Sequence, residues 1–168
     1  MTTPDPNIIY KRVERGLWAA LEADANFAAT VQPNNRIKHC TDAQPDMDKP
    51  FNLPADMPAV RIAPNGWKRY VRGSNTYALE LSYVLEVWTG DKRTTLWYGD
   101  AQWFAWIVFL RMNTVDPSTA MSGVSEFVKI EAESATQDLA RSETTDIGWI
   151  AAIDMKVVVK FDIAVITA

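Results

Sequence analysis

The last third of the chain contains a long run in which apolar residues alternate with other residues. One side of this period carries only apolar side chains: Trp149, Ala151, Ile153, Met155, Val157, Val159, Phe161, Ile163 and Val165. Such alternation is typical of a β-strand, whose successive side chains point to opposite faces of a sheet. Residues 148–165 would span roughly 60 Å at about 3.3 Å per residue, whereas strands usually have about 5–6 residues. A strand this long has to bend, carry a bulge or project beyond its own subunit, which favours an assembly protein over an enzyme.

The rest of the chain predicts one domain, residues 1–168, of the α+β class. Three-and-four spacing of apolar residues predicts a helix over residues 6–24, which Asp5 and Pro6 suit as its start. The two-residue period predicts further strands over residues 59–63 (continued after a bend by 67–71), 76–88 and 123–134. With the helix described next, the order is αββαββ. This order predicts a mainly antiparallel sheet, two helices packed on one face, and a long projecting final strand pair.

A second helix is predicted over residues 93–112, and its second half is apolar on nearly every side. The stripe expected to face the core is Leu96, Trp103, Ile107 and Leu110. Because one face suffices to cover the sheet, the remaining apolar surface is expected to meet another part of the chain or a neighbouring subunit. On this interpretation Trp103 is buried, so Trp103→Ala is predicted to cost about 3–5 kcal/mol.

Two segments show no periodic pattern. Residues 30–58 are predicted to form a long proline-rich loop, interrupted by Pro33, Pro45, Pro50, Pro54 and Pro58. The loop either wraps a neighbouring subunit or packs on its own subunit through Phe51, Leu53 and Met57. Residues 135–147 are predicted to form a polar hairpin tip that becomes ordered only in an assembly.

The loop also holds the residues that most resemble a chemical site. His39 and Cys40 are adjacent, and adjacent side chains in an extended chain point apart, so they do not suit a nucleophilic pair. A group of acidic residues lacks the spacing of a calcium-binding EF-hand: Asp42, Asp46, Asp48 and Asp56. The chain has one histidine and one cysteine, which excludes a zinc site of the ordinary type.

Other patterns of chemical sites are equally weak. Glu80 and Glu86 lie about 20 Å apart along an extended strand, too far for the paired carboxylates of a glycosidase. No glycine-rich phosphate-binding motif occurs in the sequence. We therefore expect no catalytic, cofactor-binding or metal-binding residues, no cofactor and no enzymatic activity.

Charge and hydropathy argue against nucleic-acid and membrane binding. The formal net charge is -4, and the densest basic patch, Lys68, Arg69 and Arg72, is expected to face solvent or an acidic neighbour. Residues 1–7 lack the features of a signal peptide, and the apolar run of residues 103–110 is shorter than the about 20 residues of a membrane span. The sequence thus predicts a soluble, cytoplasmic protein.

Four segments together resemble a known family. They are an N-terminal helix at residues 8–18 (IIYKRVERGLW), a long loop ending in residues 53–60 (LPADMPAV), a strand at 77–87 that leads into the helix at 96–110, and a closing strand pair at 124–133 and 149–165. Over residues 8–166 this pattern resembles the tail terminator (tail completion) proteins of long-tailed bacteriophages.

The resemblance implies a structural virion protein of the phage tail or neck, assembled in the host cytoplasm. Such a protein forms a homo-oligomeric ring, expected to be a hexamer. The ring contacts the tail-tube protein on one side, ends tube growth, and offers the head connector a surface on the other side. DNA passes through its lumen without specific binding, which the acidic balance of this chain suits.

Two alternatives remain open at this point. The chain could be another phage neck or tail assembly protein, such as a head-closure protein or a tail-tube subunit, since tube subunits also use long strand pairs. It could instead be a small ligand-binding or hydrolytic α+β domain, in which the aromatic helix would line a pocket.

Overall fold

The chain folds into an α+β structure with a mainly antiparallel sheet, as the sequence predicts. The computed structural model describes residues 6–38, 58–72, 76–89, 96–114, 121, 126–141 and 146–162. The elements, in chain order, are α1 (Pro6–Glu22), α2 (Ala25–Thr30), a short 3-10 helix (Pro33–Asn35), β1 (Arg36–Lys38), β2 (Ala59–Arg72), β3 (Thr76–Thr89), α3 (Leu96–Thr114), β4 (Glu126–Arg141) and β5 (Asp146–Asp162). None of the helices in these ranges is both long and apolar enough to cross a membrane.

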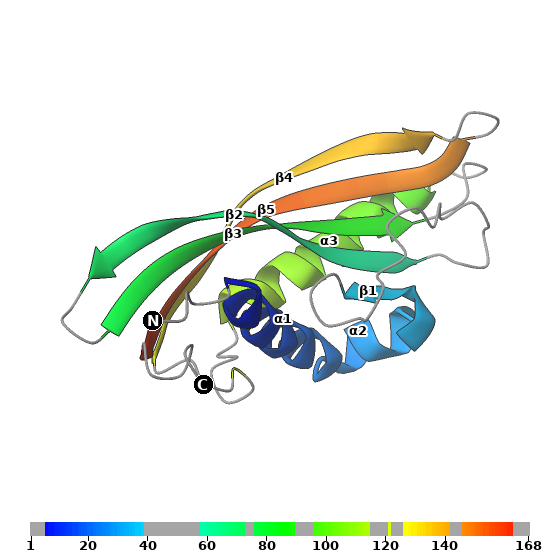
Figure 1. Ribbon diagram of the computed structural model, residues 1–168. Helices are drawn as coiled ribbons and strands as arrows, with labels where there is room; N and C mark the ends of the chain where they lie inside the picture. Colours follow the sequence, from blue (N-terminus) through cyan, green and yellow to red (C-terminus); the bar gives the residue numbers. More distant parts are fainter. Residues whose placement is uncertain are drawn as a thin grey trace.

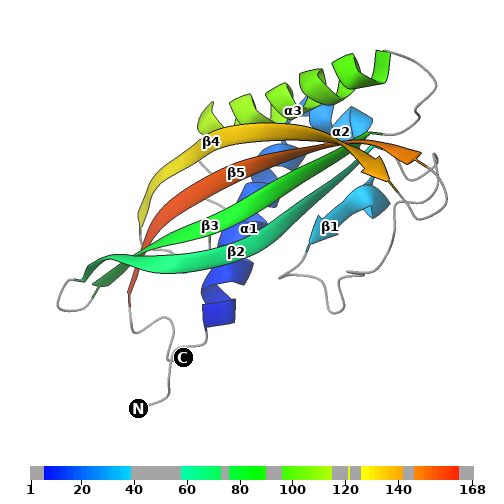
Figure 2. The same ribbon diagram turned by 90° about the horizontal axis from the view of Figure 1, so that it is seen from above.

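The strands form one sheet in the order β1-β2-β3-β5-β4. Only the three-residue β1 runs parallel to its neighbour, and the pairs β2–β3, β3–β5 and β5–β4 are antiparallel. Figure 1 shows the sheet as a curved layer above α1 and α2. Figure 2, seen from above, shows α1 crossing behind the strands and α3 running along the β4 side. The chain therefore has a layer of helices against one face of a long, curved sheet.

The hydrophobic core lies between the helices and this face of the sheet. Val13, Leu17 and Leu21 recur along α1 and are fully buried. They share one cluster with Leu85 of β3 and Ile153 of β5. Because side chains alternate along a strand, the intervening residues of β3 and β5 point to the opposite, outer face. The two-residue period read from the sequence thus marks the faces of the sheet correctly.

The central pair of strands, β3 and β5, is regular, whereas the pairs on either side of it contain register shifts. β3 and β5 pair residue for residue from Thr76↔Asp162 to Thr89↔Trp149 without a shift. The register shifts fall in the two flanking pairs, β2–β3 and β4–β5. Both shifts of the first pair place the extra residue on β2, whereas the second pair has two on β4 and one on β5. A bulge bends its strand and raises the local twist. β5 itself has one irregularity, near its start, where Ala140↔Gly148 is followed by Arg141↔Asp146, and it pairs with β3 without a shift.

The predicted loop of residues 30–58 is partly wrong. Asp24, assigned from the sequence to the first helix, is instead the N-cap of α2, and its carboxylate accepts hydrogen bonds from the backbone N–H groups of Asn26 and Phe27, both at 3.0 Å. α2 includes Thr30, and β1 follows at Arg36–Lys38. These short elements carry too few residues to show a period, and β1 exists only because it pairs with β2. Residues 39–57 lie outside the described residues.

The predicted polar tip of residues 135–147 is also mostly strand. β4 continues to Arg141, and β5 already begins at Asp146. The register shift between Ala132 and Ser134 explains the error. It moves one residue out of the alternation, so the two-residue period is lost from the sequence although the pairing with β5 continues.

Gly66 occupies the bend in β2 that the sequence predicts. Its φ angle is 124°, and an added Cβ would meet no atom within 4 Å. We expect Gly66→Ala to lower the free energy of unfolding by about 1–2 kcal/mol, because an L-residue is strained at this angle. Urea denaturation measures the change. The exposed neighbour Asn65 provides the control, since Asn65→Ala should change the value by less than about 0.5 kcal/mol. An unchanged midpoint for Gly66→Ala would contradict the strain argument.

Candidate functional site

Helix α3 has one face in the core and the opposite face in solvent. Ala105, Val108 and Met112 are buried, with Val108 and Met112 at 0% exposure. Trp103 and Trp106 are each 56% exposed. Two large indoles in solvent on a well-packed helix are unusual, because burying apolar area is the main driving force of folding.

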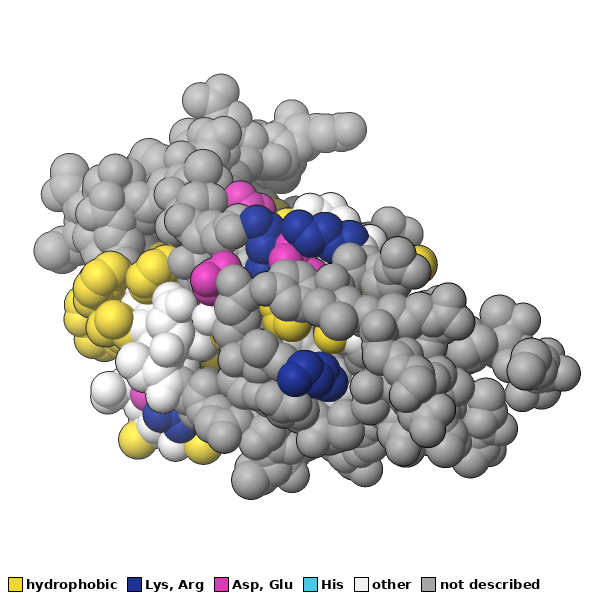
Figure 3. All heavy atoms as spheres, turned by 90° about the vertical axis from the view of Figure 1, so that its left-hand side faces the viewer, with side chains coloured by type: hydrophobic (Ala, Val, Ile, Leu, Met, Phe, Trp, Pro, Cys, Tyr) yellow, Lys and Arg dark blue, Asp and Glu magenta, His cyan; other side chains and the backbone are white. Residues whose placement is uncertain are grey.

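The exposed side of α3 is apolar along two turns. We define the α3 stripe as Trp103, Trp106, Ile107 and Leu110, whose spacing places them on one side of the helix. Leu110 is 41% exposed. Hydrophobic side chains gather in Figure 3 at the margin where α3 lies, beside surfaces with mixed charges. An exposed apolar patch bordered by polar surface is typical of a protein-binding site.

One indole of the stripe, that of Trp106, rests on a neighbouring ring. The indole of Trp106 stacks on the ring of Phe109, with centroids 5.6 Å apart and planes inclined by 9°. Phe109 is itself packed against the core. A side chain that is already ordered loses little entropy on binding, so Trp106 is suited to contact a partner.

The core-facing stripe predicted from the sequence is therefore wrong for Trp103 and Leu110, and the half-buried Ile107 lies on their side of the helix. The side chain of Leu96 lies outside the described part of the chain. The residues of α3 that lie in the core are Ala105, Val108 and Met112. A helix that is apolar on nearly every side contains no polar face from which the buried side could be read. The expectation of surplus apolar surface on this helix does agree with the exposed tryptophans.

Glu80 and Glu86 each have a cation on the neighbouring strand. Glu80 forms an ion pair with Lys68 at 2.8 Å, and Glu86 forms an ion pair with Arg61. Each pair joins directly opposite residues of β2 and β3. The two carboxylates thus act as cross-strand partners at separate positions, and they do not form the paired acids of a hydrolytic site. Lys68 also meets an acidic neighbour, as predicted for the basic patch.

The remainder of the outer sheet face carries both signs of charge. On β5, Asp154, Lys156 and Lys160 alternate with apolar residues, and Glu131 of β4 lies opposite Lys156. Figure 3 shows basic and acidic groups side by side there. A nucleic-acid-binding face would require clustered cations, which this described part of the sheet does not present.

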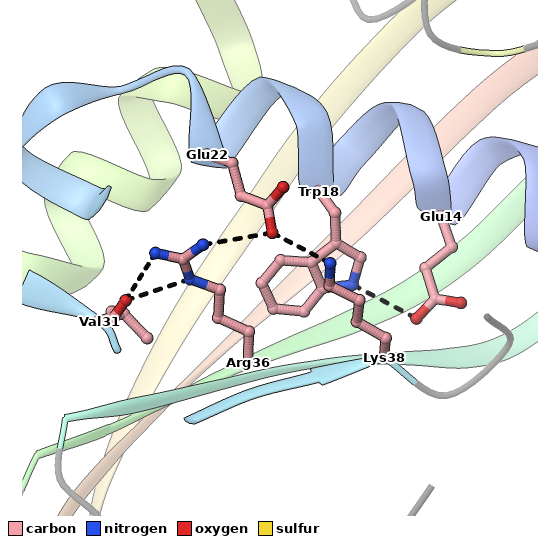
Figure 4. Close-up of polar contacts among 6 residues, drawn as sticks. All are labelled: Glu14, Trp18, Glu22, Val31, Arg36 and Lys38. Carbon is pink, nitrogen blue, oxygen red and sulfur yellow. Dashed lines mark hydrogen bonds and ion pairs between the residues drawn. The ribbon is translucent and has the colours of Figure 1, made fainter. Parts of the chain in front are cut away.

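A second polar cluster fastens β1 to α1 (Figure 4). One carboxylate oxygen of Glu22 accepts from Lys38 at 3.0 Å and from Arg36 at 3.4 Å. The guanidinium of Arg36 also donates twice to the carbonyl of Val31, at 3.1 Å and 2.8 Å. These contacts bind the short parallel strand to the helix, and they use groups that the sequence pattern assigned to a loop.

Trp18 connects this cluster to the core. Its indole N–H donates to the buried carboxylate of Glu14 at 3.3 Å, and the ammonium of Lys38 lies 5.6 Å from its ring centroid. The arrangement combines cation–π attraction with a satisfied indole donor. These contacts give the cluster a structural role, the support of β1.

The loop residues considered as chemical candidates lie outside the described residues: His39, Cys40, Asp42, Asp46, Asp48 and Asp56. Within the described ranges, no group of three or more histidine, cysteine or acidic side chains could hold a metal ion. The α3 stripe is therefore the best candidate for a functional site.

Comparison with models of known protein families gave no match, and comparison with curated proteins gave no similar sequence.

Proposed function

We propose that this chain is a structural protein of a long-tailed phage particle. It forms a ring on the end of the tail tube, ends tube growth and joins the tail to the head connector. The observation that carries the proposal is the α3 stripe, because two tryptophans held in solvent are what an assembly subunit needs. The family resemblance of the sequence supplies the kind of assembly.

In this proposal the ring subunit has the predicted αββαββ order of long elements, to which α2 and β1 are added between α1 and β2. The two main helices cover one face of the sheet, and the closing pair β4–β5 extends toward a neighbour. The pair is long enough for this role, since β4 has 16 residues and β5 has 17. The mixed charge of the outer face suits a particle through which DNA slides without specific binding.

The two alternatives differ in how well the geometry supports them. Long paired strands also suit a tail-tube subunit, and purified protein that grows into long tubes would favour that function. A small ligand-binding or hydrolytic domain is less well supported, because Trp103 and Trp106 are each 56% exposed to solvent.

Particles that lack this protein test the proposed function. We expect electron micrographs to show tails of uncontrolled length that are not joined to heads, because nothing stops the growth of the tube. Restoring the protein should restore one tail length. Tails of normal length, attached to heads in the absence of the protein, would overturn the proposal.

A further inference from the structure

The bend of β2 contains the only Asn-Gly pair of the chain, Asn65 followed by Gly66. The pairing of β2 with β3 shifts between Pro64 and Gly66. Asn65 is therefore the extra residue of a bulge, and it has no partner across the pair. Both Asn65 and Gly66 are exposed. The side-chain amide of Asn65 and the backbone nitrogen of Gly66 thus lie close together in sequence at an irregular, solvent-exposed point of the sheet.

Asparagine is among the chemically labile residues, because its side-chain amide is within reach of the next backbone nitrogen. Attack of that nitrogen on the side-chain carbon Cγ closes a five-membered ring, and it is favoured because both groups already belong to one chain. A Cβ on the following residue would hinder the approach, and Gly66 has none. An added Cβ at Gly66 would meet no atom within 4 Å, so no neighbouring side chain crowds this position.

We propose that Asn65 is a site of spontaneous deamidation. The backbone nitrogen of Gly66 loses its proton and forms a bond to Cγ of Asn65, and the side-chain nitrogen leaves as ammonia. Water then opens the cyclic imide at one of its two carbonyl groups. Cleavage of the new bond gives aspartate, whereas cleavage of the original peptide bond gives isoaspartate, in which the chain runs through the side-chain carbon.

Either product changes the surface at the bend. Each adds one negative charge to a chain whose formal net charge is -4. The new carboxylate lies on the exposed segment that continues into Trp67 and Lys68. Isoaspartate also lengthens the backbone of β2 by one methylene group. This modification does not depend on the proposed function, and converted chains should separate from unconverted ones by ion exchange.

The described residues include three other exposed asparagines, which serve as internal controls: Asn26, Asn34 and Asn113. None of them is followed by glycine. After Asn26, the backbone N–H of Phe27 donates to the carboxylate of Asp24 at 3.0 Å. After Asn34, the backbone N–H of Asn35 donates to the carbonyl of Gln32 at 2.9 Å. A hindered nitrogen, engaged in a hydrogen bond in the first two cases, is expected to keep these asparagines intact.

The reaction is measured by incubating the whole chain in warm, mildly alkaline buffer, followed by trypsin digestion and mass spectrometry. Cleavage after Arg61 and Lys68 releases residues 62–68 (IAPNGWK), whose only asparagine is Asn65. We expect the converted fraction of this peptide to rise with time, as both aspartate and isoaspartate. The rise should be at least several-fold faster than in the peptides that contain the control asparagines. A sample that is digested without incubation corrects for conversion during digestion.

Two comparisons test the mechanism and the part played by the fold. Asn65→Gln keeps a side-chain amide but would need a larger ring, so it should show little conversion. The wild type unfolded in guanidinium chloride gives the rate without the sheet, and the folded chain should convert within a few-fold of that rate because the bulge leaves Asn65 unpaired and exposed.

Four results would overturn the proposal. They are conversion of Asn65 no faster than that of the controls, conversion to aspartate alone, conversion of Asn65→Gln at the wild-type rate, and protection of Asn65 by an order of magnitude or more in the folded chain. The last result would show that pairing of β2 with β3 keeps the Gly66 nitrogen from reacting.

Discussion

Trp18→Ala should lower the free energy of unfolding by about 3–5 kcal/mol, whereas Trp103→Ala should change it by less than about 1 kcal/mol. Trp18 is 2% exposed, packs in the core and donates to Glu14. Its truncation leaves a cavity and removes a hydrogen bond from a buried carboxylate. Trp103 already has 56% of its surface in solvent. The small effect expected for Trp103→Ala differs from the sequence-based prediction, in which a buried Trp103 would give a large loss of stability.

Urea denaturation at concentrations where the chain is monomeric measures both values. The two variants make the same chemical change within a helix, so each serves as the control for the other. Equal losses would show that Trp103 is buried in the single chain, and the α3 stripe would not be a free surface.

Ile153→Lys should abolish folding, while Ala152→Lys, one residue earlier, should be tolerated. Ile153 is fully buried in the core cluster, and an unpaired ammonium there costs more than about 4 kcal/mol. That loss is a large part of the about 5–15 kcal/mol that stabilises a typical domain. Ala152 points to the outer face opposite Glu86, where a lysine meets a carboxylate and solvent.

Near-ultraviolet circular dichroism and thermal melting test this pair of variants. Ala152→Lys should keep the native signal and melt within a few degrees of the wild type, since a change below about 1 kcal/mol shifts the midpoint by about 2–4 °C in a chain of this size. A folded Ile153→Lys variant together with an unfolded Ala152→Lys variant would show that Ala152, and not Ile153, faces the core.

Local patterns determined the parts of the fold in which polar and apolar residues separate cleanly. In α1 the apolar stripe of Val13, Leu17 and Leu21 predicts the buried side, and all three are in the core. In β3 and β5 the two-residue period predicts which residues face the helices. In each case one face is buried. The pattern of apolar residues therefore indicates which side chains face the core, as well as whether the segment is a helix or a strand.

Only the tertiary structure shows the arrangement of segments in which polar and apolar residues do not separate cleanly. α3 is apolar on nearly every side, so only its packing against the sheet shows that Val108 is buried and Trp106 exposed. β1 has three residues and depends on pairing with β2 and on Glu22 of a distant helix. The bulge after Ala132 interrupts the two-residue period, so the second half of β4 was not predicted as a strand. The exposed stripe, on which the proposed function depends, follows from long-range packing that no local period in the sequence records.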